Sequence, residues 1–407
     1  MAIALPGVAA ENPAEQQTEA IYRAALAWFD QRSKDDTVAK LIPMAEAIAD
    51  RVIAGGSVYA AGDPAFCDEL NFRAGGWSGV KVWEPGQRMG EKDMLLIGIL
   101  NPLDKGARQF HAGWIGAGYG QYTAALTVYI ASRNWPQTTK LDEIVDKARW
   151  RGGFNVLDTG APEGSSWSDV ALGQLATVAM EKVLEGEIFA ALTRKNHTPA
   201  VLASIFAPGA DAFDEKIKGK LFIDEPKVEP IAAGKVGTQY LSECRRQTAA
   251  FLEQKQPEQV RNAARRLADC QQRKGVIWTV VLGHIHARGA IIAPELTRLF
   301  IYGPAWEWEN APKGLAPADT LFFLGYLSFP QAEVDAALKF CKDAVVISVD
   351  DGPANDRITT IKSCWEKWDA VADIPGYPYK ALPSSAIAHT LQWYSLMAEA
   401  QALLGKK

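Results

Sequence analysis

The chain has 407 residues, of which 48% are hydrophobic and 22% are charged. This composition supplies enough apolar material for one or two hydrophobic cores and is typical of a globular protein, with two domains the expected number. Lys and Arg number 43 against 48 Asp and Glu, which gives a formal net charge of -5. Because no block of like charges occurs, the sequence argues against nucleic acid or an anionic membrane surface as a partner.

The five cysteines are scattered and odd in number, and no pair has the Cys-x-x-Cys spacing. This pattern supports neither a disulfide framework nor a structural zinc site. The common nucleotide-binding, serine-hydrolase and zinc-protease motifs are absent as well, so we expect no cofactor. The first residues, MAIALPGVAAENPAEQQ, lack the basic segment and the long apolar run of a secretory signal. We therefore expect a cytoplasmic protein without membrane spans.

The first half alternates between helices and strands. Apolar runs typical of buried strands occur at 58–61, 93–99, 125–130 and 154–157. Apolar residues at helical spacing predict helices over 14–30, 37–54, 66–74, 106–119, 141–148 and 168–195. This alternation favours a parallel sheet with helices on both faces.

The segment that follows interrupts this pattern and is rich in Pro, Gly and charge. We expect a first domain over 1–196, a linker over 197–236 with a short helix at 200–205, and a second domain over 237–407.

The second half repeats the first in outline. Its predicted helices are 239–254, 258–273 and 384–404, and its predicted strands are 276–282, 319–327, 344–349 and 370–374. Matched elements keep an offset of about 220 residues, which indicates a duplicated domain and not a solenoid. Two like halves would form a pseudo-two-fold arrangement within one chain, and a homo-oligomer remains open.

One stretch resembles a known family. The run DELNFRAGGWSGV, 68–80, is similar to the segment after the first strand of sugar isomerase (SIS) domains, in particular of bacterial SIS proteins with a Glu-Glu-x-x-x-Arg-Ala-Gly-Gly signature. The matching residues are Asp68, Glu69, Arg73, Ala74, Gly75 and Gly76. LDTGAPEGSSWSDVALGQLATVAMEKVL, 157–184, resembles the last strand and helix of the family, and LGHIHARG, 282–289, resembles its Gly-His-x-His loop.

The resemblance implies an α/β protein with two tandem SIS-like three-layer α/β/α domains, each a mainly parallel sheet flanked by helices. SIS domains bind phosphosugars, and many interconvert aldoses and ketoses. The loops after the predicted strands depart from this pattern, because GDPAF (62–66), LNPLD (100–104) and GHIH (283–286) are poor in hydroxyls. Pro removes a backbone donor and Asp repels an anion. The expected ligand is therefore a sugar or sugar derivative, and the phosphate is left open.

The candidate catalytic residues are Glu69, His284 and His389. A carboxylate near the sheet edge can move a proton between adjacent sugar carbons, although Glu69 and Arg73 are also spaced for an ion pair on a helix. His284 and His286 form a His-x-His pair that suits acid-base chemistry, a metal ion or a helix cap. His389 is either catalytic or a buried helix histidine.

The candidate substrate contacts are Asp63, Asp104, Lys105, His286, Ser328 and Trp306. Asp63 and the Asp104 and Lys105 pair follow the first two buried strands, where ligands bind in open parallel sheets. The pair also fits a solvated helix cap. Trp306 lies in PAWEWE, and an indole there can stack on a sugar or fill a core.

Together these features favour binding of a sugar or sugar derivative at the carboxyl ends of the strands. If the protein is an enzyme, aldose-ketose isomerisation with Glu69 or a histidine as base is the expected reaction. The alternatives are a non-catalytic sugar sensor or scaffold with degenerate sites, and a metal-dependent sugar enzyme that uses His284 and His286.

Overall fold

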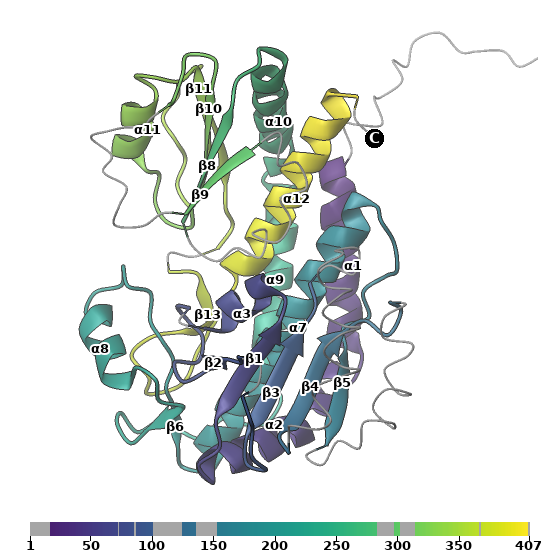
Figure 1. The fold of residues 1–407 in the computed structure, drawn as a ribbon, viewed down its shortest axis with the longest axis vertical. Coiled ribbons are helices and arrows are strands. Elements are labelled where there is room, and N and C mark those ends of the chain that lie inside the picture. Colours follow the sequence, from purple (N-terminus) through teal and green to yellow (C-terminus); the bar gives the residue numbers. More distant parts are fainter. Residues whose placement is uncertain are drawn as a thin grey trace, which may run out of the picture.

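In the part of the chain that the structure describes, the main elements are two five-stranded parallel sheets and the helices that pack between and around them (Figure 1). The computed structural model describes residues 17–71, 73–84, 87–100, 124–135, 153–282, 314–365 and 368–405, and the backbone of 297–301.

The first sheet has the strand order β2-β1-β3-β4-β5, and every neighbouring pair is parallel. Its strands are β1 (Val58–Gly62), β2 (Lys81–Val82), β3 (Met94–Gly98), β4 (Leu126–Ala131) and β5 (Phe154–Asp158). The residues of β3 and β4 are all buried, which confirms that the continuous apolar runs are interior strands. The sequence did not reveal β2, because two exposed residues carry no pattern.

The helices of the first half lie close to their predicted positions. They are α1 (Gln17–Lys34), α2 (Thr37–Ile53), α3 (Pro64–Leu70) and α7 (Trp167–Arg194). Helix α7 begins with a capping box, in which Ser166 accepts from the Asp169 amide and the Asp169 carboxylate accepts from the Ser166 amide. Helix α3 is shorter than predicted, and the helices expected at 106–119 and 141–148 lie outside the described residues.

The second sheet has the order β12-β11-β10-β8-β9, again with parallel neighbours. Its strands are β8 (Ile277–Val281), β9 (Thr297–Ile301), β10 (Thr320–Leu324), β11 (Asp343–Ser348) and β12 (Ile358–Lys362). In chain order, both sheets therefore place their first strand between the second and the third, with the fourth and fifth beyond the third.

The predicted fourth strand at 370–374 is wrong, because β12 occupies that place in the sheet. Ala370–Ala372 instead forms β13, which pairs antiparallel with β14 (Ala381–Pro383). The chain passes from β11 to β12 through 349–357 without a helix, although such crossovers usually need a dozen or more residues. Because this connection is short, the strand comes earlier in the chain than the offset of about 220 residues suggested.

Long helices join the two halves (Figure 1). The helices of the second half are α9 (Lys235–Glu253), α10 (Gln256–Gln272), α11 (Gln331–Ala337) and α12 (Ser385–Leu403). Helices α1, α7, α9 and α12 all contact one another. Their buried side chains belong to one hydrophobic core, which contains residues of both sheets. The two halves thus share a core instead of meeting at a polar surface.

The middle segment, residues 197–236, contains β6 (Thr198–Pro199), α8 (Ala210–Ile217) and β7 (Phe222–Ile223). The short helix predicted at 200–205 is wrong, because these residues lie against the turn around Gly75 and Gly76. The Gly75 amide donates to Leu202 O (2.6 Å), and the Leu382 amide donates to Gly75 O (2.7 Å). Gly75 has φ +77°, and a Cβ there would lie 2.9 Å from Pro383 Cδ. The turn thus connects the first half to the middle segment and to the second half.

Candidate functional site

Asp63 directly follows β1, at the point where the strand order of the first sheet reverses. After β1 the chain forms β2 on one side of it and then β3 on its other side, and open α/β sheets bind ligands where the strand order reverses in this way. Asp63 is the N-cap of α3, and its amide donates to Gly98 O (3.0 Å). Its Oδ2 accepts from the Leu100 amide (2.6 Å). The structure therefore places this predicted ligand contact at the carboxyl ends of β1 and β3, half-buried.

Helices α7 and α12 bring two polar side chains to this place that the sequence analysis missed. Gln174 Nε2 donates to the Tyr394 hydroxyl, and both side chains are buried. Burial raises the pKa of Tyr394, and the charge of nearby Asp63 raises it further. Among the described residues, Gln174 Oε1 has no hydrogen-bond partner. Exchanging the two amide atoms would leave Nε2 unpaired instead, so one polar atom beside Tyr394 is available to a ligand or a water.

Two indoles flank these polar groups. The rings of Trp167 and Tyr394 lie 6.0 Å apart, and Trp135 Nε1 donates to Pro162 O (3.2 Å). A Cβ on Gly173 would lie 3.3 Å from Trp135 and 3.6 Å from Leu100 O, so α7 passes close to the ends of β3 and β4. A carboxylate, an amide, a phenol and indoles form a set that can hydrogen-bond and stack on a polyhydroxylated molecule.

The switch point of the second sheet lies between β8 and β10. His389, a predicted catalytic residue, is 1% exposed, and its Nε2 lies 3.0 Å from Gly325 O directly after β10. The Trp365 ring packs edge-on against the imidazole at 5.1 Å. Ser328, a predicted substrate contact, is exposed in the turn after β10. The structure therefore places both residues near this sheet edge, with the imidazole held against the backbone.

Tyr326 also follows β10, and its hydroxyl lies 3.2 Å from the Ser204 hydroxyl of the middle segment. Burial raises the pKa of Tyr326 to about 12, against the lowering effect of the Ser204 hydrogen bond. The charge of Arg73 lowers the same pKa by a smaller amount. Residues of the first half and of the middle segment thus reach the carboxyl edge of the second sheet.

Glu69, the other predicted catalytic residue within the described ranges, belongs to α3 and is 2% exposed. Glu69 and Arg73 do not lie on one helix as predicted, because α3 ends at Leu70 before Arg73. Arg73 Nε donates to Asp68 O (3.1 Å). Glu69 interacts electrostatically with Glu181 and Lys182 of α7. The residue therefore belongs to a buried group of charges.

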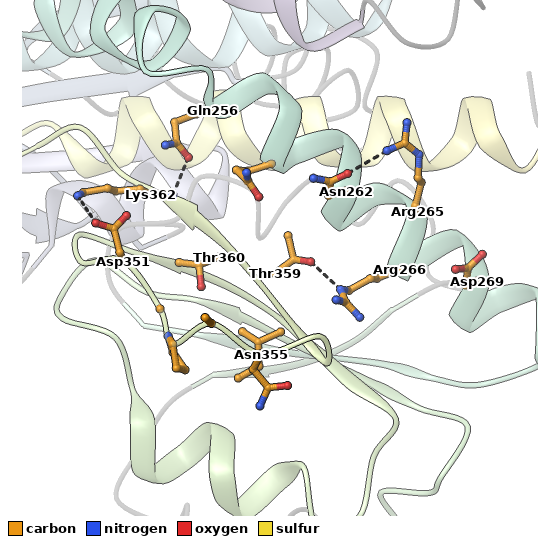
Figure 2. A pocket seen from close by; sticks show the side chains of 15 residues that line it. Gln256, Asn262, Arg265, Arg266, Asp269, Asp351, Asn355, Thr359, Thr360 and Lys362 are labelled. Atoms are coloured by element: carbon orange, nitrogen blue, oxygen red, sulfur yellow. Dashed lines mark hydrogen bonds and ion pairs between the residues drawn. The ribbon is translucent and has the colours of Figure 1, made fainter.

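A wide groove of about 670 Å³ lies elsewhere, between α10 and the edge strand β12 (Figure 2). Its cations already have partners within the groove: Arg266 Nε donates to Thr359 Oγ1 (2.6 Å), and Lys362 pairs with Asp351 (2.8 Å). The groove lies beside the short connection from β11 to β12, where no crossover helix covers the sheet. Its lining residues come from α10, β12 and the connection before β12, and β12 is an edge strand, so the groove does not lie at the switch point of either sheet.

Several predicted site residues lie outside the described residues, namely Asp104, Lys105, His284, His286 and Trp306. Within the described ranges, no three His, Cys, Asp or Glu side chains gather as a metal ion would require. Among the described residues, no helix combines the length and the apolar character needed to cross a membrane.

Comparisons with known proteins gave structural matches alone. No family model and no curated protein matches the chain. A tagatose-6-phosphate ketose/aldose isomerase of Escherichia coli aligns with a TM-score of 0.46 and 11% identity, over 98% of this chain and 95% of the other. A candidate phosphosugar isomerase of Silicibacter pomeroyi aligns at 0.43 and 12%, over 97% and 98%. Likeness at this level assigns neither a ligand nor an activity to this protein.

Proposed function

We propose that this protein binds a sugar or sugar derivative at the carboxyl ends of β1 and β3. The supporting observation is the buried amide of Gln174, which has one polar atom without a partner among the described residues and lies beside the Tyr394 hydroxyl. Leaving such an atom unsatisfied costs about 1–3 kcal/mol, and a ligand hydroxyl would remove that cost. Asp63 adds an acceptor for hydroxyl protons, and Trp167 adds an apolar ring surface.

The same geometry favours a binding protein over an isomerase that relies on Glu69 or His389. A general base must reach the proton that it removes. Glu69 of α3 is buried among other charges, and the His389 imidazole is held at the Gly325 carbonyl. A non-catalytic sugar sensor or scaffold, whose sites no longer carry out the reaction, accounts for both placements.

The binding proposal is tested by adding aldoses, ketoses and their phosphates to the protein and measuring thermal stability and calorimetric affinity. A ligand that binds the folded state raises the melting temperature in proportion to ln(1 + [L]/Kd). We expect Gln174→Leu and Tyr394→Phe to weaken sugar binding about tenfold, since each removes about one hydrogen bond to the ligand.

Gln392→Leu provides the matched control. Gln392 lies at the same distance from the N-cap serine of α12 as Gln174 does in α7, is buried, and has an Oε1 without a partner among the described residues. It donates to Ser363 at the end of β12, away from Asp63. Stabilisation by no sugar, or equal affinities in all three variants, would overturn the proposal. Deuterium from heavy water at the second sugar carbon would instead show an isomerase.

We also propose that the chain contains two copies of one ancestral unit, with domains at 1–196 and 237–407 and a linker at 197–236. The shared order of the two sheets supports this proposal, as do the equivalent glutamines of α7 and α12. Because α12 brings Tyr394 to the edge of the first sheet, the proposed site needs both copies.

A further inference from the structure

A buried group of four charged side chains lies where α3 and the Gly75–Gly76 turn meet α7. It contains Glu69 of α3 and Glu181, Lys182 and Glu185 of α7, each no more than 2% exposed. Lys182 Nζ lies 2.8 Å from Glu185 Oε2 and 3.2 Å from Glu181 Oε2. Glu185 uses its other oxygen, Oε1, to accept from the Trp77 amide (2.8 Å). We refer to these four residues as the charged cluster.

The charged cluster contains three carboxyl groups and one ammonium group. If all were ionised, the four side chains together would carry a net charge of -2 away from water, which is unfavourable in a protein interior. Glu181 is the member that geometry leaves least satisfied, because its Oε1 has no hydrogen-bond partner among the described residues. A carboxyl group in that position is most stable when it keeps its proton.

The groups that face Glu181 come from each neighbouring element. Glu69 approaches from α3, Lys182 and Glu185 belong to α7, and Tyr240 belongs to α9. Burial raises the pKa of Glu181 to about 8, Lys182 lowers it, and Glu185 and Glu69 raise it. Burial lowers the pKa of Lys182, but the neighbouring carboxylates together raise it by more, so the lysine stays charged while Glu181 titrates. The pKa of Tyr240 is raised by burial, so its hydroxyl stays neutral in the same range.

We propose that the charged cluster is a pH-sensitive joint: it holds a proton on Glu181 near neutral pH, and loss of that proton loosens the Gly75–Trp77 turn and α3 from α7. The turn is the element that responds, because its attachment to α7 includes the hydrogen bond from the Trp77 amide to Glu185. A negative charge on Glu181 competes with Glu185 for Lys182 and repels Glu69. The same turn contacts the middle segment and β14, so the joint lies where both halves meet.

The direction of the pH effect follows from the two states of the chain. In the unfolded chain, Glu181 loses its proton in the ordinary carboxyl range, whereas the folded protein keeps it up to about pH 8. The folded state therefore binds more protons over this interval, and its stability falls as pH rises from about 4.5 to 8 and then levels. Glu181→Gln imitates the protonated carboxyl at every pH and removes this decline.

The test compares amide hydrogen exchange of Trp77 in the full chain at pH 7 and pH 9, expressed as protection factors so that intrinsic exchange rates cancel. We expect protection of Trp77 to fall about tenfold in the wild-type protein and to remain unchanged in Glu181→Gln. The Gly237 amide is the matched control, because it also donates to a glutamate of α7, Glu187 (2.8 Å), and this contact is not part of the charged cluster.

Thermal melting gives a second measurement that does not depend on local exchange. Glu181→Gln should melt at the same temperature as the wild-type protein at pH 5 and at least about 2 °C higher at pH 9. Equal protection of Trp77 at both pH values, or an equal decline in the variant, would overturn the proposal. Since no sugar enters either measurement, this inference and the proposed function can fail separately.

Discussion

At the end of β3, the absence of a side chain on Gly98 makes room for an aromatic ring. A Cβ at this position would lie 2.2–2.4 Å from three ring carbons of Phe66, which is buried on α3. Because the ring is enclosed, it cannot move away at low cost. We expect Gly98→Ala to lower the free energy of unfolding by about 1–3 kcal/mol, as overpacking does elsewhere. Urea denaturation measures this change.

Gly90→Ala is the control for that substitution. A Cβ on Gly90 would contact one atom alone, Asp93 Oδ2 at 3.7 Å, and should change the free energy of unfolding by less than about 0.5 kcal/mol. Equal effects of the two substitutions would show that the Phe66 ring yields and that the close approach of α3 to β3 is not required.

Residues of the candidate site differ in how well the sequence revealed them. Asp63 could be predicted, because it follows an apolar strand and precedes a proline that starts a helix. Gln174 and Tyr394 could not, since they lie on helices that are buried on nearly every side. Their approach to Asp63 depends on how α7 and α12 pack, which no local pattern encodes. The one sequence feature that could have indicated them is a glutamine at the same distance from the N-cap serine in both apolar helices, Gln174 in α7 and Gln392 in α12.

At the scale of elements, the buried strands and long helices could be predicted because their apolar patterns reflect burial directly. Elements whose position depends on the rest of the fold were missed. The strand at 370–374 was placed by its distance from the first half, whereas β12 follows a connection too short for a helix. Helix α3 was extended too far, because its end at Leu70 is set by the turn that contacts the middle segment.

Each half also caps the first helix of the other. Glu187 of α7 accepts from the Gly234 and Gly237 amides at the start of α9 (2.7 and 2.8 Å), and Glu399 of α12 accepts from the Thr18 amide near the start of α1 (3.0 Å). These carboxylates satisfy helix amides that have no partner within the helix. The last helix of each half therefore stabilises the start of the first helix described in the other half.

Glu187→Ala should lower the free energy of unfolding by about 1–3 kcal/mol, because two amide donors at the start of α9 lose their acceptor. Urea denaturation with a fluorescence readout measures the loss. Glu215→Ala is a suitable control, since Glu215 is exposed on α8 and pairs loosely with Lys218 (3.5 Å). If both substitutions had the same small effect, the amides at the start of α9 would have to be satisfied in another way.

At the scale of the whole molecule, the two faces of the second sheet pack against different hydrophobic clusters. Phe322 and Val345 face the core that both halves share, whereas Leu321 and Val346 face a smaller cluster on the opposite side. The alternation follows from the strand period of two. The second half consequently depends on the first for one face of its sheet but not for the other.

Because helices of both halves contribute to one core, we expect the two sheets to unfold together. Hydrogen exchange at increasing urea should give the same opening free energy for the amides of Leu96 in β3 and Phe322 in β10, within about 0.5 kcal/mol. The Phe213 amide of α8 should open at lower free energy, because α8 packs mainly in two small separate clusters. Earlier opening of Phe322 than of Leu96 would show that the outer cluster of the second sheet suffices for independent folding and that the shared core does not couple the halves.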